Sequence, residues 1–160
     1  MRLRIATLTD LDAITALENI CFPPNEAASR TTFIKRLQSF PDHFWVLEID
    51  GVLVGFINGM VTNNETIKDE MFANANLHDD NGKWQSVFGL AVAPEWRRQG
   101  HAERLIRHLI EKAKAEERLG VTLTCKELLV PYYEKFGFAD GGISTSAHGG
   151  EVWRDMRIRF

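Results

Sequence analysis

An apolar strand, a charged turn with a glycine and an amphipathic helix follow one another in the middle of this chain. Residues 87–92 are almost all apolar, which predicts a strand that is buried on both faces. Pro94 ends this strand, and the turn Arg97-Arg98-Gln99-Gly100-His101-Ala102 follows. The apolar spacing after the turn predicts a helix over residues 100–118. This unit can bury its apolar surfaces only among other strands and helices, so it predicts an α/β fold.

The remaining sequence predicts further strands and helices on both sides of this unit. Thr9 and Asp12 have the spacing of a helix capping box, and Asp50-Gly51 has the composition of a hairpin turn. Gly55 and Gly59 indicate a bulge or a close backbone approach within the second strand of that hairpin. The predicted elements are an edge strand near 2–5, helices near 9–21 and 32–40, strands at 44–49 and 52–60, a short helix within 64–83, a strand at 121–125, a helix from 131 to 137, and a final hairpin.

The turn before the central helix is suited to a phosphate group. The N-terminus of a helix presents unpaired N–H groups and the positive end of the helix dipole. Gly100 permits close backbone approach, while Arg97 and Arg98 add positive charge. The turn lacks the Gly-Lys-Ser/Thr end of a nucleotide P-loop and the three glycines of a dinucleotide site. It therefore predicts a diphosphate held by backbone amides without a metal, although a charged surface loop fits the same residues.

Length and charge restrict the classes of protein that remain. The 160 residues predict a single domain over 1–160, and the net charge of −3 argues against a nucleic-acid partner. There is no signal-peptide pattern and no apolar run of membrane-spanning length. Two cysteines are too few for a disulfide framework, so we expect a cytoplasmic protein. The five histidines are scattered, so no metal site is expected, and the oligomeric state, monomer or homodimer, is left open.

Two motifs at a defined spacing resemble the GCN5-related N-acetyltransferase (GNAT) superfamily. The first is Arg97-x-x-Gly100-x-Ala102 after the apolar strand, and the second is Tyr133-x-x-x-Gly137-Phe138. The segment Leu123-Thr124-Cys125-Lys126-Glu127-Leu128-Leu129-Val130-Pro131-Tyr132-Tyr133 is similar to the arylalkylamine (serotonin-type) N-acetyltransferase branch. This resemblance implies one domain with a mixed, mostly antiparallel twisted sheet, a splayed central strand pair and flanking helices.

The resemblance also implies acetyl-CoA as the co-substrate and assigns residues to it. Backbone groups of Leu90, Ala91 and Val92 are expected to line the pantetheine and the thioester, next to a gap that opens toward the strand at 121–125. The expected diphosphate site consists of Arg97, Arg98, Gln99, Gly100, His101, Ala102 and Glu103. His101 is expected to contribute its backbone amide, with its ring facing solvent or the cofactor.

Tyr133 is the predicted catalytic residue. The resemblance places its phenol at the sulfur, where a group with a pKa near ~10 can protonate the departing thiolate. A packed aromatic, or a hydrogen-bond anchor for the sulfur, is the alternative role. Tyr132 points about 100° away on a helix and is expected in the core, and Cys125 is expected to be a packed thiol without a nucleophilic role.

The base that takes the proton of the amine is not apparent in the sequence. The arylalkylamine branch uses two histidines on the central strand, and the matching positions here are Ser86 and Phe88. Neither side chain acts as a base near neutral pH. Glu26, Glu70, His148 or a chain of water molecules are the candidate replacements.

The acceptor is expected to be the amine of a small molecule. A protein or peptide amine is the first alternative, and an acetyl-CoA-binding module without turnover is the second. Specificity is expected on the loops at 22–31 and 61–83, where the acids of the second loop either attract a cationic amine or form a solvated surface. Phe22, Met60 and Trp84 are candidates for an acceptor pocket, with core packing as their alternative role.

Overall fold

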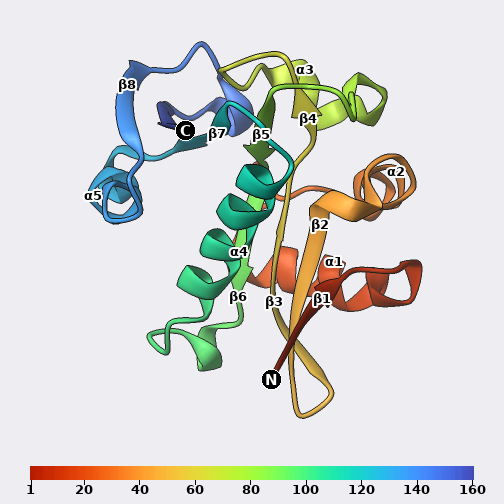
Figure 1. The fold of residues 1–160 in the computed structure, drawn as a ribbon. Helices are drawn as coiled ribbons and strands as arrows, with labels where there is room; N and C mark the ends of the chain where they lie inside the picture. The colour runs from red at the N-terminus through yellow and green to blue at the C-terminus, as the bar shows by residue number, and fades with distance from the viewer.

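The computed structural model describes all residues, 1–160, and contains two β-sheets flanked by helices (Figure 1). The strands are β1 Arg2–Ile5, β2 Phe44–Ile49, β3 Val52–Asn58, β4 Val61–Thr62, β5 Trp84–Val87, β6 Gly89–Val92, β7 Gly120–Cys125, β8 Ala139–Ile143 and β9 Arg154–Arg159. The helices are α1 Leu11–Cys21, α2 Arg30–Ser39, α3 Asp69–Ala73, α4 His101–Ala115 and α5 Val130–Glu134. The order of these elements confirms the predicted α/β layout.

The first sheet has the order β1-β2-β3-β6, and the second has the order β4-β5-β7-β9-β8. All neighbouring pairs are antiparallel except β5 and β7, which run parallel. The prediction of a mostly antiparallel arrangement is confirmed. There are two sheets rather than one because β5 pairs with β7, whereas the next strand, β6, pairs with β3.

The prediction of one continuous strand over 87–92 is wrong, because the chain breaks at Phe88. Gly89 is paired with Asn58, and the N–H of Phe88 also donates to the carbonyl of Asn58 at 2.7 Å. Two residues therefore oppose one, which is the geometry of a β-bulge and bends the strand. The segment before the bulge, β5, stays beside β7, whereas β6 continues beside β3.

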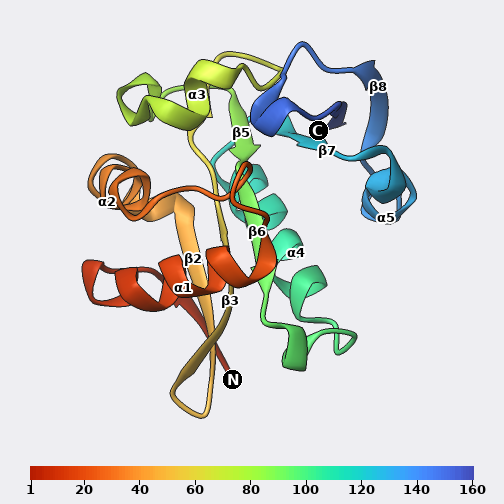
Figure 2. The same ribbon diagram turned by 180° about the vertical axis from the view of Figure 1, so that it is seen from behind.

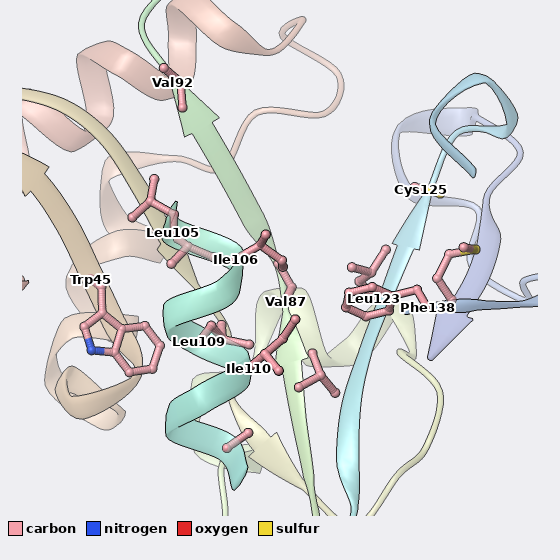
Figure 3. Packing of buried hydrophobic residues seen from close by; sticks show 14 of the residues in the cluster. Trp45, Val87, Val92, Leu105, Ile106, Leu109, Ile110, Leu123, Cys125 and Phe138 are labelled. Atoms are coloured by element: carbon pink, nitrogen blue, oxygen red, sulfur yellow. The ribbon is translucent and has the colours of Figure 1, made fainter. Parts of the chain in front are cut away.

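Helix α4 covers one face of the first sheet, and α1 and α2 cover the other (Figures 1 and 2). The predicted apolar stripe of α4 is buried at Leu105, Ile106 and Leu109. Figure 3 shows these side chains between Trp45 of β2 and Val87 of β5. This packing fixes the direction in which α4 begins, and therefore the position of the turn before it.

Two local details refine the sequence prediction. The first capping residue is Thr7, whose N–H donates to the carboxylate of Asp10 at 2.8 Å, so the predicted pair Thr9 and Asp12 is wrong. The same Thr-x-x-Asp spacing occurs two residues earlier, where Arg4 also binds Asp10. Gly59 confirms the predicted close backbone approach, because a Cβ there would lie 1.9 Å from the carbonyl oxygen of Ser86.

Candidate active site

A gap opens between β6 and β7 beyond the point where the parallel pairing ends. Val87 and Leu123 form the last pair of β5 and β7. After the bulge, the strand that carries Val92 diverges from the strand that carries Cys125 (Figure 3). The splayed strand pair that the sequence predicted is therefore β6 and β7.

The open edge of β6 presents polar backbone groups to this gap. In an antiparallel ladder every second residue bonds to the partner strand. Ala93 donates to Val54, so Ala91 is the next residue bonded to β3, while Leu90 and Val92 face the gap. On that side, Sγ of Cys21 and Nε of Arg97 already donate to the carbonyl of Val92. The N–H and carbonyl of Leu90 and Val92 thus point toward the gap, whereas those of Ala91 point toward β3, and the contacts of all three residues with acetyl-CoA stay predictions.

The turn before α4 lines a cavity of about 470 Å³, which we call the turn cavity. Gly100 has φ +81° and precedes the helix, and Arg98 also has a positive φ of 63°. The first N–H bonded within the helix is that of Arg104, which donates to Gly100, so the N–H groups before it have no helical partner. Basic residues outnumber acidic ones in the lining, which is completed by Val92, Trp96, Arg97, His101, Ala102, Glu103, Arg107, Tyr132, Lys135 and Phe136. The turn cavity thus fits a diphosphate.

Three side chains of this region have contacts that the sequence did not show. Arg97 donates from Nε to the carbonyl of Val92 at 3.0 Å, so its charge is anchored at the end of β6. His101 is buried, with Nδ1 3.1 Å from Arg104, so its ring does not face solvent. It lines the turn cavity, so the other expected direction of the ring, toward the cofactor, stays a prediction. Burial lowers the pKa of His101, which keeps the ring neutral beside the positive helix end. Tyr132 lines the turn cavity and is half-buried, so the prediction that it belongs to the core is wrong.

A second cavity, of about 320 Å³, lies where β6 and β7 separate, and we call it the acceptor cavity. It is lined from α1 and the loop after it, from the bulge, from β7 and from the C-terminal loop. The lining is mostly apolar with a few charged groups: Glu18, Cys21, Phe22, Pro23, Glu26, Ala28, Arg36, Phe72, Val87, Phe88, Gly89, Leu90, Leu123, Thr124, Cys125, Lys126, Leu129, Tyr133, His148 and Trp153. Such a cavity suits a small molecule with one reactive polar group.

Tyr133 lies in the lining of the acceptor cavity, together with Cys125 and Leu90. Burial raises the pKa of the Tyr133 phenol, so the group stays protonated at working pH and can act as a proton donor. Burial also raises the pKa of the Cys125 thiol to about 11, which leaves it protonated and a poor nucleophile. Tyr133 therefore lies at the open end of the two strands, and its role as the acid stays a prediction.

Glu18 is a functional candidate that the sequence reasoning missed. Its side chain comes from α1, is 6% exposed and lines the acceptor cavity. One carboxylate oxygen, Oε2, accepts from the N–H of Ala28 at 2.8 Å, whereas Oε1 has no partner. The sequence contains one signal for it. Ile14, Glu18 and Cys21 are at positions i, i+4 and i+7 of one helix face, and Glu18 is the charged residue on that otherwise apolar face.

The electrostatic surroundings suit Glu18 as a base. Burial raises the pKa of its carboxyl group, while the N–H of Ala28 and the charge of Arg36 oppose this shift. Arg36 is itself buried, and burial lowers its pKa to about 10, so it remains cationic near neutral pH. Its guanidinium lies over the ring of Phe88 and donates to the side chain of Asn58 at 3.1 Å. A raised pKa brings a carboxylate closer to the range in which general bases work.

The base candidates from the sequence are placed differently. Glu26 and His148 line the acceptor cavity, but Glu26 pairs with Lys126 at 3.0 Å and His148 Nε2 lies 2.9 Å from the carbonyl of Glu26. These contacts join the loop after α1 to the residue that follows β7 and to the C-terminal loop. Glu70 is exposed and lies outside the cavity lining. Ser86 is buried in β5, also outside that lining.

The three residues that the sequence offered for an acceptor pocket do not all line this cavity. Phe22 lines the acceptor cavity. Met60 is fully buried in a small cluster near α3, and Trp84 is 3% exposed in β5, so both have their alternative role in packing. From residues 61–83 only Phe72 reaches the cavity, which favours the solvated-surface interpretation of the acids in that segment.

The fold brings together one group with metal-ligand spacing that the sequence did not show. Atoms of His43, His78 and Asp80 lie within 4.8 Å of one another. The N–H of Val61 donates to Nδ1 of His78, which leaves the ring proton on Nε2, the atom that faces Asp80 at 2.6 Å. A ring nitrogen that carries its proton has no lone pair for a metal. The geometry favours a hydrogen-bonded loop anchor over a ligand set.

Comparison with known proteins identifies the family. The model of the acetyltransferase (GNAT) family matches residues 11–138. The chain therefore belongs to the GNAT acetyltransferase family, and the resemblance seen in the motifs is confirmed.

No helix of the structure has the length and apolar character needed to span a bilayer.

Several named proteins resemble this chain. Serotonin N-acetyltransferase of Mesocricetus auratus is 34% identical over 109 residues, which are 68% of this chain but only about half (51%) of that protein. An N-alpha-acetyltransferase of Sulfurisphaera tokodaii is 27% identical, over 87% of this chain and 80% of the relative. Among solved structures, the loading GNATL domain of CurA from Lyngbya majuscula has a TM-score of 0.84 at 16% identity, covering 99% of this chain and 96% of that domain. That structural likeness shows the fold.

Proposed function

We propose that this protein is an acetyl-CoA-dependent N-acetyltransferase whose acceptor is the primary amine of a small molecule. The observation that carries the proposal is one cavity at the open edge of β6 that contains a protonated phenol, Tyr133, and a carboxylate with a free oxygen, Glu18. The turn cavity lies at the start of α4, beyond the end of the same strand. The proposed phosphate site in the turn cavity and the proposed acyl-transfer site in the acceptor cavity thus lie next to each other along the gap. We also propose a cytoplasmic location, because two cysteines are too few for a disulfide framework.

The residues around the gap fit acetyl-CoA, and each has a different role in the reaction. Acetyl-CoA supplies a thioester carbonyl that an amine can attack directly. Backbone groups at Leu90 and Val92 orient the ligand and can donate to the oxygen that gains negative charge. Glu18 removes the proton from the amine, and Tyr133 gives a proton to the sulfur. No acetyl group has to rest on the protein.

The lining of the acceptor cavity supports a small acceptor with an apolar part. Phe22, Phe72, Phe88 and Trp153 contribute four aromatic rings, and the volume of about 320 Å³ is that of a small-molecule site. An N-terminal amine of a peptide is the second candidate, because the N-alpha-acetyltransferase of Sulfurisphaera tokodaii matches over 80% of its length.

An amine panel tests the function and separates the two candidates. The protein is incubated with acetyl-CoA and, in turn, polyamines, arylalkylamines and short peptides, and the release of free thiol is followed. We expect thiol release with small primary amines at higher kcat/KM than with any peptide. A preference for peptides would support the second candidate, and no release with any amine despite acetyl-CoA binding would contradict catalysis.

Replacing Tyr133 by Phe tests the acid role. We expect kcat to fall by about 10- to 100-fold, at the lower end for a general acid because a thiolate is a good leaving group. The affinity for acetyl-CoA, measured by calorimetry, should change little because only the hydroxyl is lost. Tyr132→Phe removes the hydroxyl of the neighbouring tyrosine, which lines the turn cavity and not the acceptor cavity, and should not reproduce the loss of kcat. An unchanged kcat in Tyr133→Phe would contradict the role.

The pH dependence of kcat/KM follows from the raised pKa of Glu18. A base must be deprotonated, so activity should be lost as pH falls through that pKa, which lies above the usual value of 4.5. Two acceptors whose amine pKa values differ should share this limb, because it belongs to the protein. A limb that moves with the acceptor, with no common component, would contradict the assignment.

A further inference from the structure

Two buried atoms without hydrogen-bond partners face the same spot beside the acceptor cavity. They are Oε1 of Glu18 and Nδ2 of Asn58. A Cβ added to Gly89 would lie 3.4 Å from Asn58 Nδ2 and 4.0 Å from Glu18 Oε1. Gly89 and Glu18 both line the acceptor cavity, so this spot opens toward the place of the amine.

The chemical character of both atoms is fixed by their other contacts. Arg36 donates to Oδ1 of Asn58 at 3.1 Å, so the amide group must turn its donor, Nδ2, toward Gly89. Ala28 donates to Oε2 of Glu18, which leaves Oε1 as the free acceptor. Asn58 is fully buried and Glu18 nearly so, which makes an unpaired polar atom costly at this place. The spot therefore has a hydrogen-bond donor on one side and an acceptor on the other.

A water molecule matches this pair, whereas an ammonium group does not. An ammonium group has only hydrogen-bond donors and cannot accept from the side-chain N–H of Asn58. A water molecule can accept from Asn58 and donate to Glu18. A buried water normally has two to four polar partners, and the amine would be the third here. Resting on the proposed function, we infer that a water held above Gly89 by Asn58 and Glu18 relays the proton of the acceptor amine to Glu18.

The relay moves one proton and no other atom. The N–H bond of the attacking amine breaks, and its proton passes to the oxygen of the water. The water gives one of its own protons to Glu18 Oε1, and the electron pair of the broken N–H bond stays on nitrogen. Glu18 later returns its proton to solvent. Asn58 acts as a positioning residue, because it holds the water and touches neither the amine nor the thioester.

Gly89→Ala and Gly89→Ser form a matched pair that tests this relay. Gly89 has no positive φ, and its Cβ position meets nothing closer than 3.4 Å, so a Cβ fits there without backbone strain. Alanine fills the water position with a methyl group and should lower kcat by about 10- to 100-fold. Serine has the same Cβ but adds a hydroxyl that both donates and accepts, so it should recover kcat to within about 3-fold of the wild type.

Further measurements separate the relay from a steric effect and from the proposed function. KM for the amine, the melting temperature and acetyl-CoA affinity by calorimetry should be nearly the same in both variants. Wild-type kcat in Gly89→Ala, or equal losses in the alanine and serine variants, would overturn the relay. If Glu18→Gln is inactive while Gly89→Ala is fully active, only the relay fails. If the wild type acetylates no amine, the proposed function fails as well.

Discussion

Glu18→Gln is expected to lower kcat by on the order of 100- to 1,000-fold, the range for loss of a general base. Glutamine keeps the shape of the side chain and an oxygen that accepts from Ala28, but it cannot take a proton. Acetyl-CoA affinity should be unchanged, because Glu18 lies in the acceptor cavity and outside the lining of the turn cavity. The acid limb of the pH profile should also disappear in this variant. Steady-state kinetics across pH and calorimetry with acetyl-CoA provide the measurements.

Glu70→Gln is the control for this experiment. Glu70 is also an acid that the sequence offered as a base, but it is exposed and outside both cavities. Its substitution should leave kcat and KM within about 2-fold of the wild type, as for other surface changes. A thermal melt shows that each variant is folded. Equal activity of Glu18→Gln and Glu70→Gln would remove Glu18 from the mechanism.

Gly100→Glu is expected to abolish acetyl-CoA binding. The new carboxylate would stand at the open N-terminus of α4, where the N–H groups before Arg104 are free to hold a diphosphate. Repulsion between two unit charges ~5 Å apart is about 3 kcal/mol at an effective dielectric constant of ~20. This energy corresponds to a loss of roughly 100-fold in affinity for each phosphate charge. Calorimetry with acetyl-CoA and with CoA measures the loss.

Gly142→Glu separates charge at the turn from backbone strain. Gly142 has φ +94°, close to the +81° of Gly100, and its Cβ would meet nothing within 4 Å. The substitution therefore introduces similar backbone strain and the same charge in β8, a mostly exposed strand outside the lining of the turn cavity. Acetyl-CoA should bind this variant with wild-type affinity. Persistent binding in Gly100→Glu would show that the phosphate site lies elsewhere.

The proposed cofactor site could be predicted from the sequence because its residues are close together in the chain. The apolar strand, Gly100 and the helix after it are adjacent in the chain, and Tyr133 follows at a spacing that one further strand explains. Sequence alone could not show that the strand breaks at Phe88. The bulge arises from pairing with Asn58, a residue of another strand.

The proposed amine site could not be predicted from the sequence because it is assembled from distant segments. Glu18 comes from α1, Arg36 from α2 and Asn58 from β3, and they meet beside Gly89 only after the first sheet has formed. Their spacing in the sequence carries no motif. The one local signal, an acid on the apolar face of α1, indicates burial but does not show which groups surround it.

The fate of the acetyl group tests direct transfer at this gap most sharply. The protein is mixed with acetyl-CoA and a small primary amine that releases thiol, the reaction is quenched within one turnover, and both the amine and the intact protein are weighed by mass spectrometry. The account predicts an amine that carries one acetyl group and a protein of unchanged mass at every time point. An acetylated protein that forms and decays at the rate of turnover, with the group on Cys21, Cys125 or any other side chain, would contradict it.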